Sequence, residues 1–86
     1  MNFPSRGTPE FWDLYRGLPV DARELARKNY QLWSKFPFHP SLHFKKIGGG
    51  KWSARLGINY RAVGMFHDGT FVWGWIGTHA EYDRLP

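Results

Sequence analysis

The stretch KWSARLGINYRAVGMFHDGTFVWGWIGTH, residues 51–79, decides the fold. Large apolar residues alternate in it with polar or small ones, and the alternation is interrupted at Gly57-Ile58-Asn59 and at Asp68-Gly69. A period of two residues is typical of strands with one buried face, and Asp-Gly tolerates the positive φ angles of a two-residue type I′ turn. The stretch therefore predicts two successive hairpins in an antiparallel sheet.

The second hairpin is predicted to bring large rings opposite small residues. Counting outward from Asp68-Gly69 gives the pairs Phe66 with Phe71, Gly64 with Trp73, Ala62 with Trp75, and Tyr60 with Gly77. Residues directly opposite each other share a face, and alternation of large and small side chains suits close packing against a second layer. We expect this face to form the core.

The first hairpin is predicted to place Arg55 directly opposite Arg61, on the other face of the sheet. Like charges opposite each other destabilise a sheet. No acidic residue lies between Glu24 and Asp68 to separate the two arginines. The pattern therefore favours a face that receives an anion.

Composition limits the class of protein. The 86 residues contain no cysteine, so neither disulfides nor a cysteine zinc site hold the fold, and residues 1–86 are expected to form a single cytoplasmic domain. No signal peptide or membrane span is expected. Twelve Lys and Arg against seven Asp and Glu give a net charge of +5, which suits nucleic acid or an acidic protein, or serves only solubility.

Two helices are predicted before the sheet. Thr8-Pro9-Glu10 is a helix start, and an apolar stripe at helical spacing continues to Leu18. Pro19 opens a second helix that runs to about Lys35, where Pro37 and Pro40 exclude continuation. The two helices form an αα-hairpin, whereas residues 1–7 fit either a frayed arm or a short edge strand.

The remaining segments complete an α+β fold. Residues 42–47, LHFKKI, are predicted to be the first strand of the sheet, and Gly48-Gly49-Gly50 the turn that follows it. A short helical turn at the C-terminus would project His79 and Tyr82 from the same side. We expect the αα-hairpin to pack on one face of a twisted antiparallel sheet of about four strands.

The helices followed by HPSLHFKKI, WSARLG, YRAVG and FVWGWIGTHAEYDRL, in this order and spacing, resemble the RelE/ParE superfamily of bacterial type II toxin–antitoxin toxins. The resemblance covers residues 11–85. It implies a RelE-like fold and a toxin neutralised by an antitoxin that wraps it. The cationic face would need this cognate antitoxin to be acidic, and no cofactor and no membrane partner are expected. It also implies one of two targets, which are messenger RNA on the ribosome for RelE-like members and DNA gyrase for ParE-like members.

The resemblance also implies roles for particular residues. Arg61 matches the arginine that contacts the scissile phosphate in RelE-like nucleases, and His79 and Tyr82 resemble the C-terminal residues that serve in acid–base work or base stacking. RNA or phosphate binding is then expected of four further residues, Arg55, Lys45, Lys46 and His43. The sequence departs from its relatives in two ways. RelE has more lysines on the central strands, where this chain has Ser53, and some relatives have His and Tyr side by side, whereas His79 and Tyr82 are three positions apart.

The implied chemistry is RNA cleavage without a metal. It needs a base for the 2′-hydroxyl proton, an acid for the leaving 5′-oxygen, and cations for the developing charge. His79 suits proton transfer because histidine titrates near neutrality, and arginines hold phosphate with two-pronged geometry. The four histidines fall on separate elements, so no metal site is expected. The alternatives are a non-enzymatic toxin that binds gyrase and a toxin-fold protein that acts only through partner binding.

Overall fold

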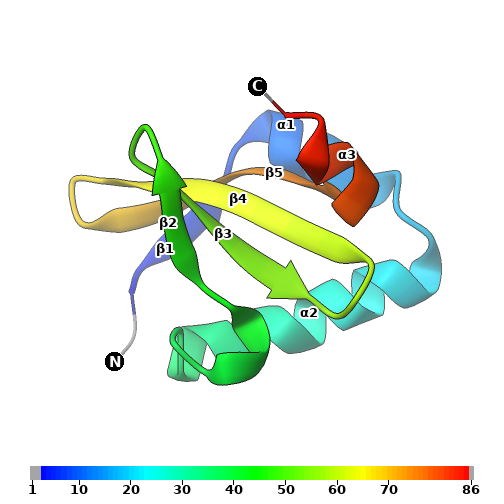
Figure 1. The fold of residues 1–86 in the computed structure, drawn as a ribbon, viewed down its shortest axis with the longest axis horizontal. Coiled ribbons are helices and arrows are strands. Elements are labelled where there is room, and N and C mark those ends of the chain that lie inside the picture. The colour runs from blue at the N-terminus through cyan, green and yellow to red at the C-terminus, as the bar shows by residue number, and fades with distance from the viewer. Residues whose placement is uncertain (1–2, 86) are drawn as a thin grey trace.

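The computed structural model describes residues 3–85, which form a five-stranded sheet with two helices on one face and a short helix at the other (Figure 1). The elements in chain order are β1 (Ser5–Gly7), α1 (Pro9–Arg16), α2 (Val20–Lys35), the 3₁₀ helix η1 (Pro40–Leu42), β2 (Lys45–Gly48), β3 (Lys51–Leu56), β4 (Tyr60–His67), β5 (Thr70–Thr78) and α3 (His79–Asp83). The predicted α+β class and the two N-terminal helices are confirmed. No helix in the described part of the chain has the length and apolar character needed to cross a bilayer.

The sheet has one strand more than expected, and it is mixed. Its order is β1-β5-β4-β3-β2, and β1 runs parallel to β5 while every other pair is antiparallel. Phe71 N donates to Pro4 O (2.8 Å) and Thr8 N donates to Trp73 O (2.9 Å), so backbone bonds hold β1 at both ends. Residues 5–7 are therefore the edge strand and not the frayed arm.

The register predicted for the first hairpin is confirmed. β3 and β4 pair with Leu56 opposite Tyr60, and Arg55 lies opposite Arg61 as expected. The three-residue turn between these strands includes Gly57, which has a φ of 73°. At the next turn Asp68 and Gly69 have φ angles of 50° and 82°, as the Asp-Gly signal requires.

A β-bulge at Gly74 overturns two of the predicted pairs in the second hairpin. Gly64 lies opposite Trp73 as predicted, but the register then shifts, so that Trp75 pairs with Val63 and not with Ala62. The same shift places Thr78, not Gly77, opposite Tyr60. The physical reason is fit, because Ile76, only 2% exposed, fills the core position beside Ala62. A glycine inside a strand accepts the extra residue of a bulge, and Trp75 turns to the opposite face.

The first of the antiparallel strands starts later than predicted. Leu42 lies in η1 and is fully buried, His43 has a left-handed φ of 43°, and β2 begins at Lys45. Pro40 starts the 3₁₀ turn, and the His39 ring nitrogen accepts from Ser41 N at 3.2 Å. This local cap competes with strand pairing, so the strand cannot include residues 42–44.

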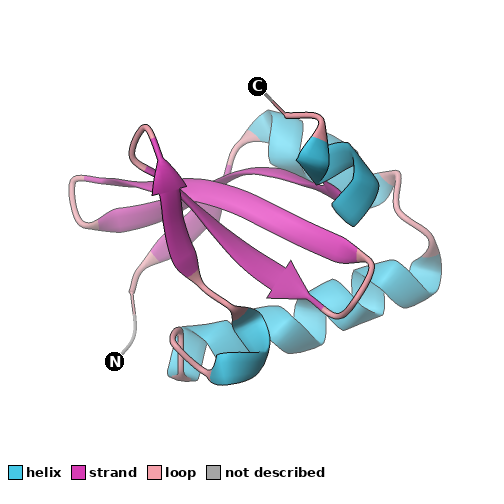
Figure 2. Ribbon diagram, viewed as in Figure 1, coloured by secondary structure: helices cyan, strands magenta, loops and turns pink. Residues whose placement is uncertain are grey.

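The helices cover the aromatic face of the sheet (Figure 2). Thr8 caps α1 by accepting from Phe11 N, as predicted. α1 packs on β5 and β1, while α2 packs on β3. Trp33 of α2 is only 2% exposed and lies 5.3 Å from Phe71, ring centre to ring centre. We call this side of the sheet the helical face.

The other side carries the basic side chains, and we call it the cationic face. The pairing register assigns to it five cations from four strands, namely Arg6, Lys45, Lys51, Arg55 and Arg61. In Figure 1, α3 lies in front of the sheet near the end of β5, whereas α1 lies behind it. Among the elements of residues 3–85, only α3 therefore covers the cationic face.

Candidate functional site

The short helix α3 is fixed at the end of β5 by a complete capping box. Thr78 Oγ1 accepts from Glu81 N (3.1 Å), and Glu81 Oε1 accepts from Thr78 N (2.8 Å). This reciprocal pair satisfies two donors that a helix start would otherwise leave free. The backbone N–H of His79 also donates to Asn59 O at 2.7 Å, which ties the helix to the turn between β3 and β4. The cap therefore holds His79 beside the start of β4.

Arg61, His79 and Tyr82 form one cluster on the cationic face. Arg61 Nε donates to His79 Nδ1 at 3.1 Å, and Arg61 Cζ lies 5.0 Å from the centre of the Tyr82 ring. The rings of His79 and Tyr82 are nearly parallel, with a 21° interplanar angle and 6.1 Å between centres. The three residues that the family resemblance singled out for catalysis therefore lie together.

The contact between Arg61 and His79 determines where the histidine carries its proton. Arginine donates and does not accept, so Nδ1 offers its lone pair and the proton of the neutral ring lies on Nε2. Nε2 lies 3.6 Å from Asp83 Oδ2, one helical turn away. The histidine side chain is 48% exposed, so a substrate can reach it.

Arg61 brings an unpaired donor to this cluster. Its Nη1 is buried and has no hydrogen-bond partner among the protein's atoms. No ion pair joins Arg61 to a carboxylate within residues 3–85. The acidic groups of the described residues therefore do not neutralise the guanidinium, while Nη1 itself is enclosed by surrounding atoms.

Glu81 serves the helix cap and not the cluster. Hydrogen bonds from the backbone and then from the side chain of Thr78 lower the pKa of Glu81 below its ordinary value, and Arg84 lowers it further. The ionised carboxylate is therefore the form that holds the cap.

Within residues 3–85, none of the other expected binding residues hydrogen-bonds to Arg61, His79 or Tyr82. Arg55 shares the cationic face, but its Nε donates to Gly57 O at 3.2 Å, so Arg55 and Arg61 are held by acceptors on different elements. Lys45 is exposed on the same face, opposite Ser53. Lys46 lies opposite Trp52 and thus belongs to the helical face, and His43 is exposed in the loop before β2.

Trp75 is one of the site residues that sequence reasoning missed. The bulge at Gly74 places it on the cationic face, where its ring lies 6.4 Å from that of Tyr82. It is packed over Gly77, since a Cβ at that glycine would lie 2.6 Å from the Trp75 ring. The available signal was the glycine between two tryptophans, which marks a possible bulge inside a strand.

A groove of about 840 Å³, which Tyr82 is the one member of the cluster to line, extends along the cationic face. Trp75, Tyr82 and Val63 line it together with two cations, Arg6 and Lys51. Arg6 was also missed, because it reaches this face only through the pairing of β1 with β5. The groove therefore combines aromatic surface with two cations and one carboxylate, that of Asp83.

No group of three His, Asp or Glu side chains that could hold a metal ion occurs within residues 3–85. The cluster itself contains one histidine, one arginine and one tyrosine. These residue types can transfer a proton, hold a phosphate and stack on a base.

Comparison with known proteins identifies the fold. The sequence matches no protein-family model and no curated protein. The structure is similar to the toxin–antitoxin complex RelBE2 from Mycobacterium tuberculosis, with a TM-score of 0.73 and 20% identity, covering 92% of this chain and 100% of that one. It is also similar to a mutant of the Escherichia coli toxin RelE in the free state, with a TM-score of 0.71 and 17% identity, covering 96% and 90% of the two chains.

A third similar structure is a YoeB/ParE toxin from Agrobacterium tumefaciens, with a TM-score of 0.68 and 18% identity, covering 88% of this chain and 98% of that chain. All three likenesses extend over most of both chains. The chain therefore has the fold of the RelE/ParE toxins, as the sequence resemblance predicted.

Proposed function

We propose that this chain, which has the fold of the RelE/ParE toxins, is the toxin of a type II toxin–antitoxin system and cleaves messenger RNA on the ribosome without a metal. The observation that carries the proposal is the contact of Arg61 with His79 and Tyr82. A phosphate-binding cation, a titratable ring and a stacking surface thus lie within one cluster. A toxin that acts only by binding has no need of a proton-transfer group at this position.

In the proposed reaction the 2′-oxygen of the RNA attacks the adjacent phosphorus, and the bond from phosphorus to the 5′-oxygen breaks. Arg61 turns from His79 to the scissile phosphate, because an anion is a stronger partner for a guanidinium than a neutral ring nitrogen. This movement frees the Nδ1 lone pair of His79, which takes the 2′-hydroxyl proton. The leaving 5′-oxygen must gain a proton, and Tyr82 supplies the remaining O–H donor of the cluster.

The groove on the cationic face accounts for RNA binding. Bases in single-stranded RNA stack on aromatic side chains, and Trp75 and Tyr82 both line the groove. Arg6 and Lys51 lie along it, where they can neutralise phosphates on either side of the cleaved bond. In this arrangement Arg55 and Lys45 contribute to the positive field of the face without touching the scissile group.

An acidic antitoxin fits the same surface. The chain carries a net charge of +5, and the cations of the cationic face form no ion pairs within the described part of the chain. An antitoxin segment rich in carboxylates would complement this face and exclude RNA from it.

Cleavage of messages by translating ribosomes tests the proposal. We expect the wild type to cut, His79→Ala to cut about 10²–10⁴-fold more slowly, and Arg61→Ala to cut about 10²–10³-fold more slowly. Lys28→Ala is the matched control, because it removes one positive charge from an exposed position on α2, away from the cationic face. Thermal unfolding of each variant verifies that the fold is retained.

Two results would contradict the proposal. Intact messages in the presence of the wild type, together with trapped complexes of gyrase and DNA, would replace it with the gyrase-binding function. Equal cleavage by the wild type and both site variants would remove the cluster from the mechanism.

A further inference from the structure

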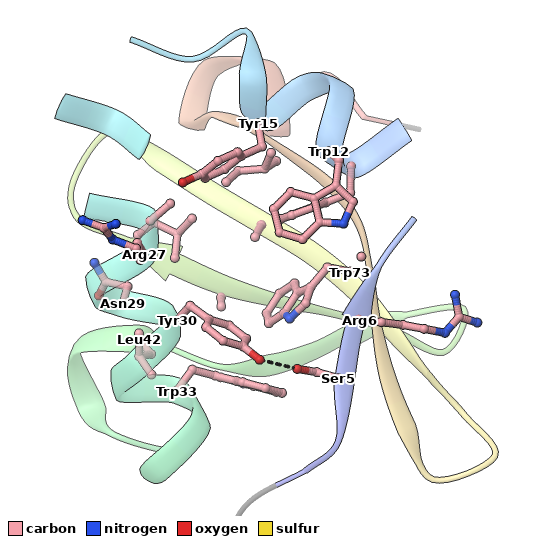
Figure 3. A pocket seen from close by; sticks show the side chains of 17 residues that line it. Ser5, Arg6, Trp12, Tyr15, Arg27, Asn29, Tyr30, Trp33, Leu42 and Trp73 are labelled. Atoms are coloured by element: carbon pink, nitrogen blue, oxygen red, sulfur yellow. Dashed lines mark hydrogen bonds between the residues drawn. The ribbon is translucent and has the colours of Figure 1, made fainter. Parts of the chain in front are cut away.

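Trp52 lies on the helical face at the edge of the cover that the helices provide. Where α1 and α2 cross the sheet they enclose a cavity of about 290 Å³, lined in part by Ser5 and Tyr30, whose hydroxyl oxygens lie 2.8 Å apart (Figure 3). Trp52 pairs with Gly64 on this face but lies outside the cavity, and it is partly exposed. It is the second residue of β3, next to the turn from β2, at the end of the sheet that also carries the turn between β4 and β5 (Figure 1).

The Trp52 ring is supported by neighbouring rings on one face only. Phe44, which is 7% exposed, stacks against it with 4.8 Å between ring centres and 25° between ring planes. Phe38 and Phe66 meet the same ring edge-on, at 65° and 89°. Within residues 3–85 no other aromatic ring pairs with Trp52, and no cation lies over it. The face of Trp52 that points away from Phe44 is therefore covered by neither a ring nor a cation.

The side chains around Trp52 are exposed, and one of them is positively charged. Phe38 is 62% exposed and Phe66 is 37% exposed, so both offer apolar surface beside Trp52. Lys46 lies directly opposite Trp52 in the pairing of β2 with β3, and it is also exposed. β2, β3 and β4 contain no acidic residue that could offset this charge. We call Trp52, Phe38, Phe66 and Lys46 together the aromatic slot.

Phe66 connects the aromatic slot to the groove on the cationic face. It lines that groove together with Lys51, the residue before Trp52. Bases of single-stranded RNA stack on aromatic rings while nearby cations bind the phosphates. A symmetric pair of chains would instead bring Lys46 of both copies to one interface, where the like charges repel. The exposed rings and the positive charge therefore fit single-stranded RNA better than a second copy of this chain.

We propose that the aromatic slot binds a base of the message that occupies the groove. The base stacks on the free face of Trp52, beside Phe38 and Phe66, and Lys46 neutralises the adjacent phosphate. This role rests on the proposed function, because the strand in the slot is the one that the groove holds. It also accounts for Lys46, the expected phosphate-binding residue that the strand register places on the helical face.

A 2′-O-methyl oligouridylate dodecamer is the probe, because it lacks the 2′-hydroxyl and stays intact. The chain has five tryptophans, and each indole N–H gives its own proton–nitrogen correlation signal, which single Trp→Phe variants assign. We expect the dodecamer to shift the signals of Trp52 and Trp75 saturably and to leave that of Trp33, which is 2% exposed, in place. Both shifts should saturate at the same concentration, since one strand occupies the slot and the groove.

Three variants measure the contribution of the slot in a fluorescence anisotropy titration. Trp52→Ala should weaken binding about 5- to 140-fold, the loss of one stacked base. Phe38→Ala should also weaken binding, and its exposed position keeps the fold, so a Trp52→Ala variant that does not fold leaves the test intact. Lys46→Ala should reduce the slope of log affinity against log salt concentration by about 0.7. Lys28→Ala, at an exposed position on α2, is the matched control and should leave that slope unchanged.

Three outcomes would overturn the proposal. A Trp52 signal that stays in place while that of Trp75 shifts would confine the RNA to the groove and leave the proposed function standing. Wild-type affinity and salt slope in both Phe38→Ala and Lys46→Ala would remove the slot from RNA binding. A Trp52 shift caused by oligoglutamate but not by the dodecamer would assign the slot to an acidic protein. Failure of the proposed function is a separate result, because it appears as intact messages on translating ribosomes.

Discussion

Gly64 at the centre of β4 provides a quantitative test of the packing. A Cβ at this position would lie 2.4 Å from Phe71 Cε2 and 2.5 Å from the carbonyl oxygen of Val72. Real side chains essentially never approach this closely. Phe71 is fully buried, and its ring lies 4.5 Å from that of Trp73 and 5.3 Å from that of Trp33, centre to centre. The ring therefore has no free space into which it can move.

Gly64→Ala is expected to reduce the free energy of unfolding. Overpacking of a well-packed core costs about 1–3 kcal/mol, while replacing glycine with alanine returns about 0.4–1 kcal/mol by restricting the unfolded chain. The net loss is up to about 2.6 kcal/mol, which for a domain of this size lowers Tm by up to about 10–21 °C. Urea unfolding followed by tryptophan fluorescence measures the free energy directly.

Gly74→Ala is the matched control for this prediction. Gly74 lies on the neighbouring strand, and a Cβ there would meet nothing within 4 Å. Its backbone is also outside the left-handed region, so alanine introduces no strain. We expect its free energy of unfolding to be unchanged or higher by up to about 1 kcal/mol. Equal stability of the two variants would refute the packing of the Phe71 ring against Gly64.

Three further predictions concern the cluster and its support. The pKa of Glu81 in the folded protein lies below its ordinary value of 4.5, so the carboxylate stabilises the fold above that pH. This contribution is lost as the pH falls through the folded pKa. In urea unfolding between about pH 6 and pH 3, Glu81→Gln should therefore lose less free energy of unfolding than the wild type. Gly77→Ala would bring a Cβ to 2.6 Å from the Trp75 ring, so cleavage and the Trp75 indole signal should both change, and an unchanged signal would contradict the placement of that ring. Trp75→Ala should weaken single-stranded RNA binding by about 1–3 kcal/mol, the contribution of one stacked base, in a fluorescence anisotropy titration.

Much of the sheet could be predicted because its turns are local. Asp68-Gly69 determines the pairs next to it, and the three-residue turn around Ile58 brings Arg55 opposite Arg61. These signals need only the conformational preferences of a few adjacent residues. The helix start at Thr8 is predictable for the same reason.

The features that could not be predicted depend on contacts between distant residues. The bulge at Gly74 follows from whether Trp75 or Ile76 fits beside Ala62 once the helices are packed. The strand at residues 5–7 forms only because the edge of β5 is available to it. Both features alter the candidate site, since the bulge delivers Trp75 to the groove and the edge strand delivers Arg6. The sequence alone therefore indicated the central cluster but not the surface around it.

The chemical nature of the cut RNA ends tests the central claim most directly. Attack by the 2′-oxygen leaves a cyclic phosphate on the upstream fragment and a 5′-hydroxyl on the downstream fragment, and polynucleotide kinase labels that hydroxyl without prior dephosphorylation. The proposed roles of Arg61 and His79 predict 5′-hydroxyl ends on messages cut in the presence of translating ribosomes, and their loss in His79→Ala. Messages that remain intact, or fragments that carry a 5′-phosphate, would contradict the account.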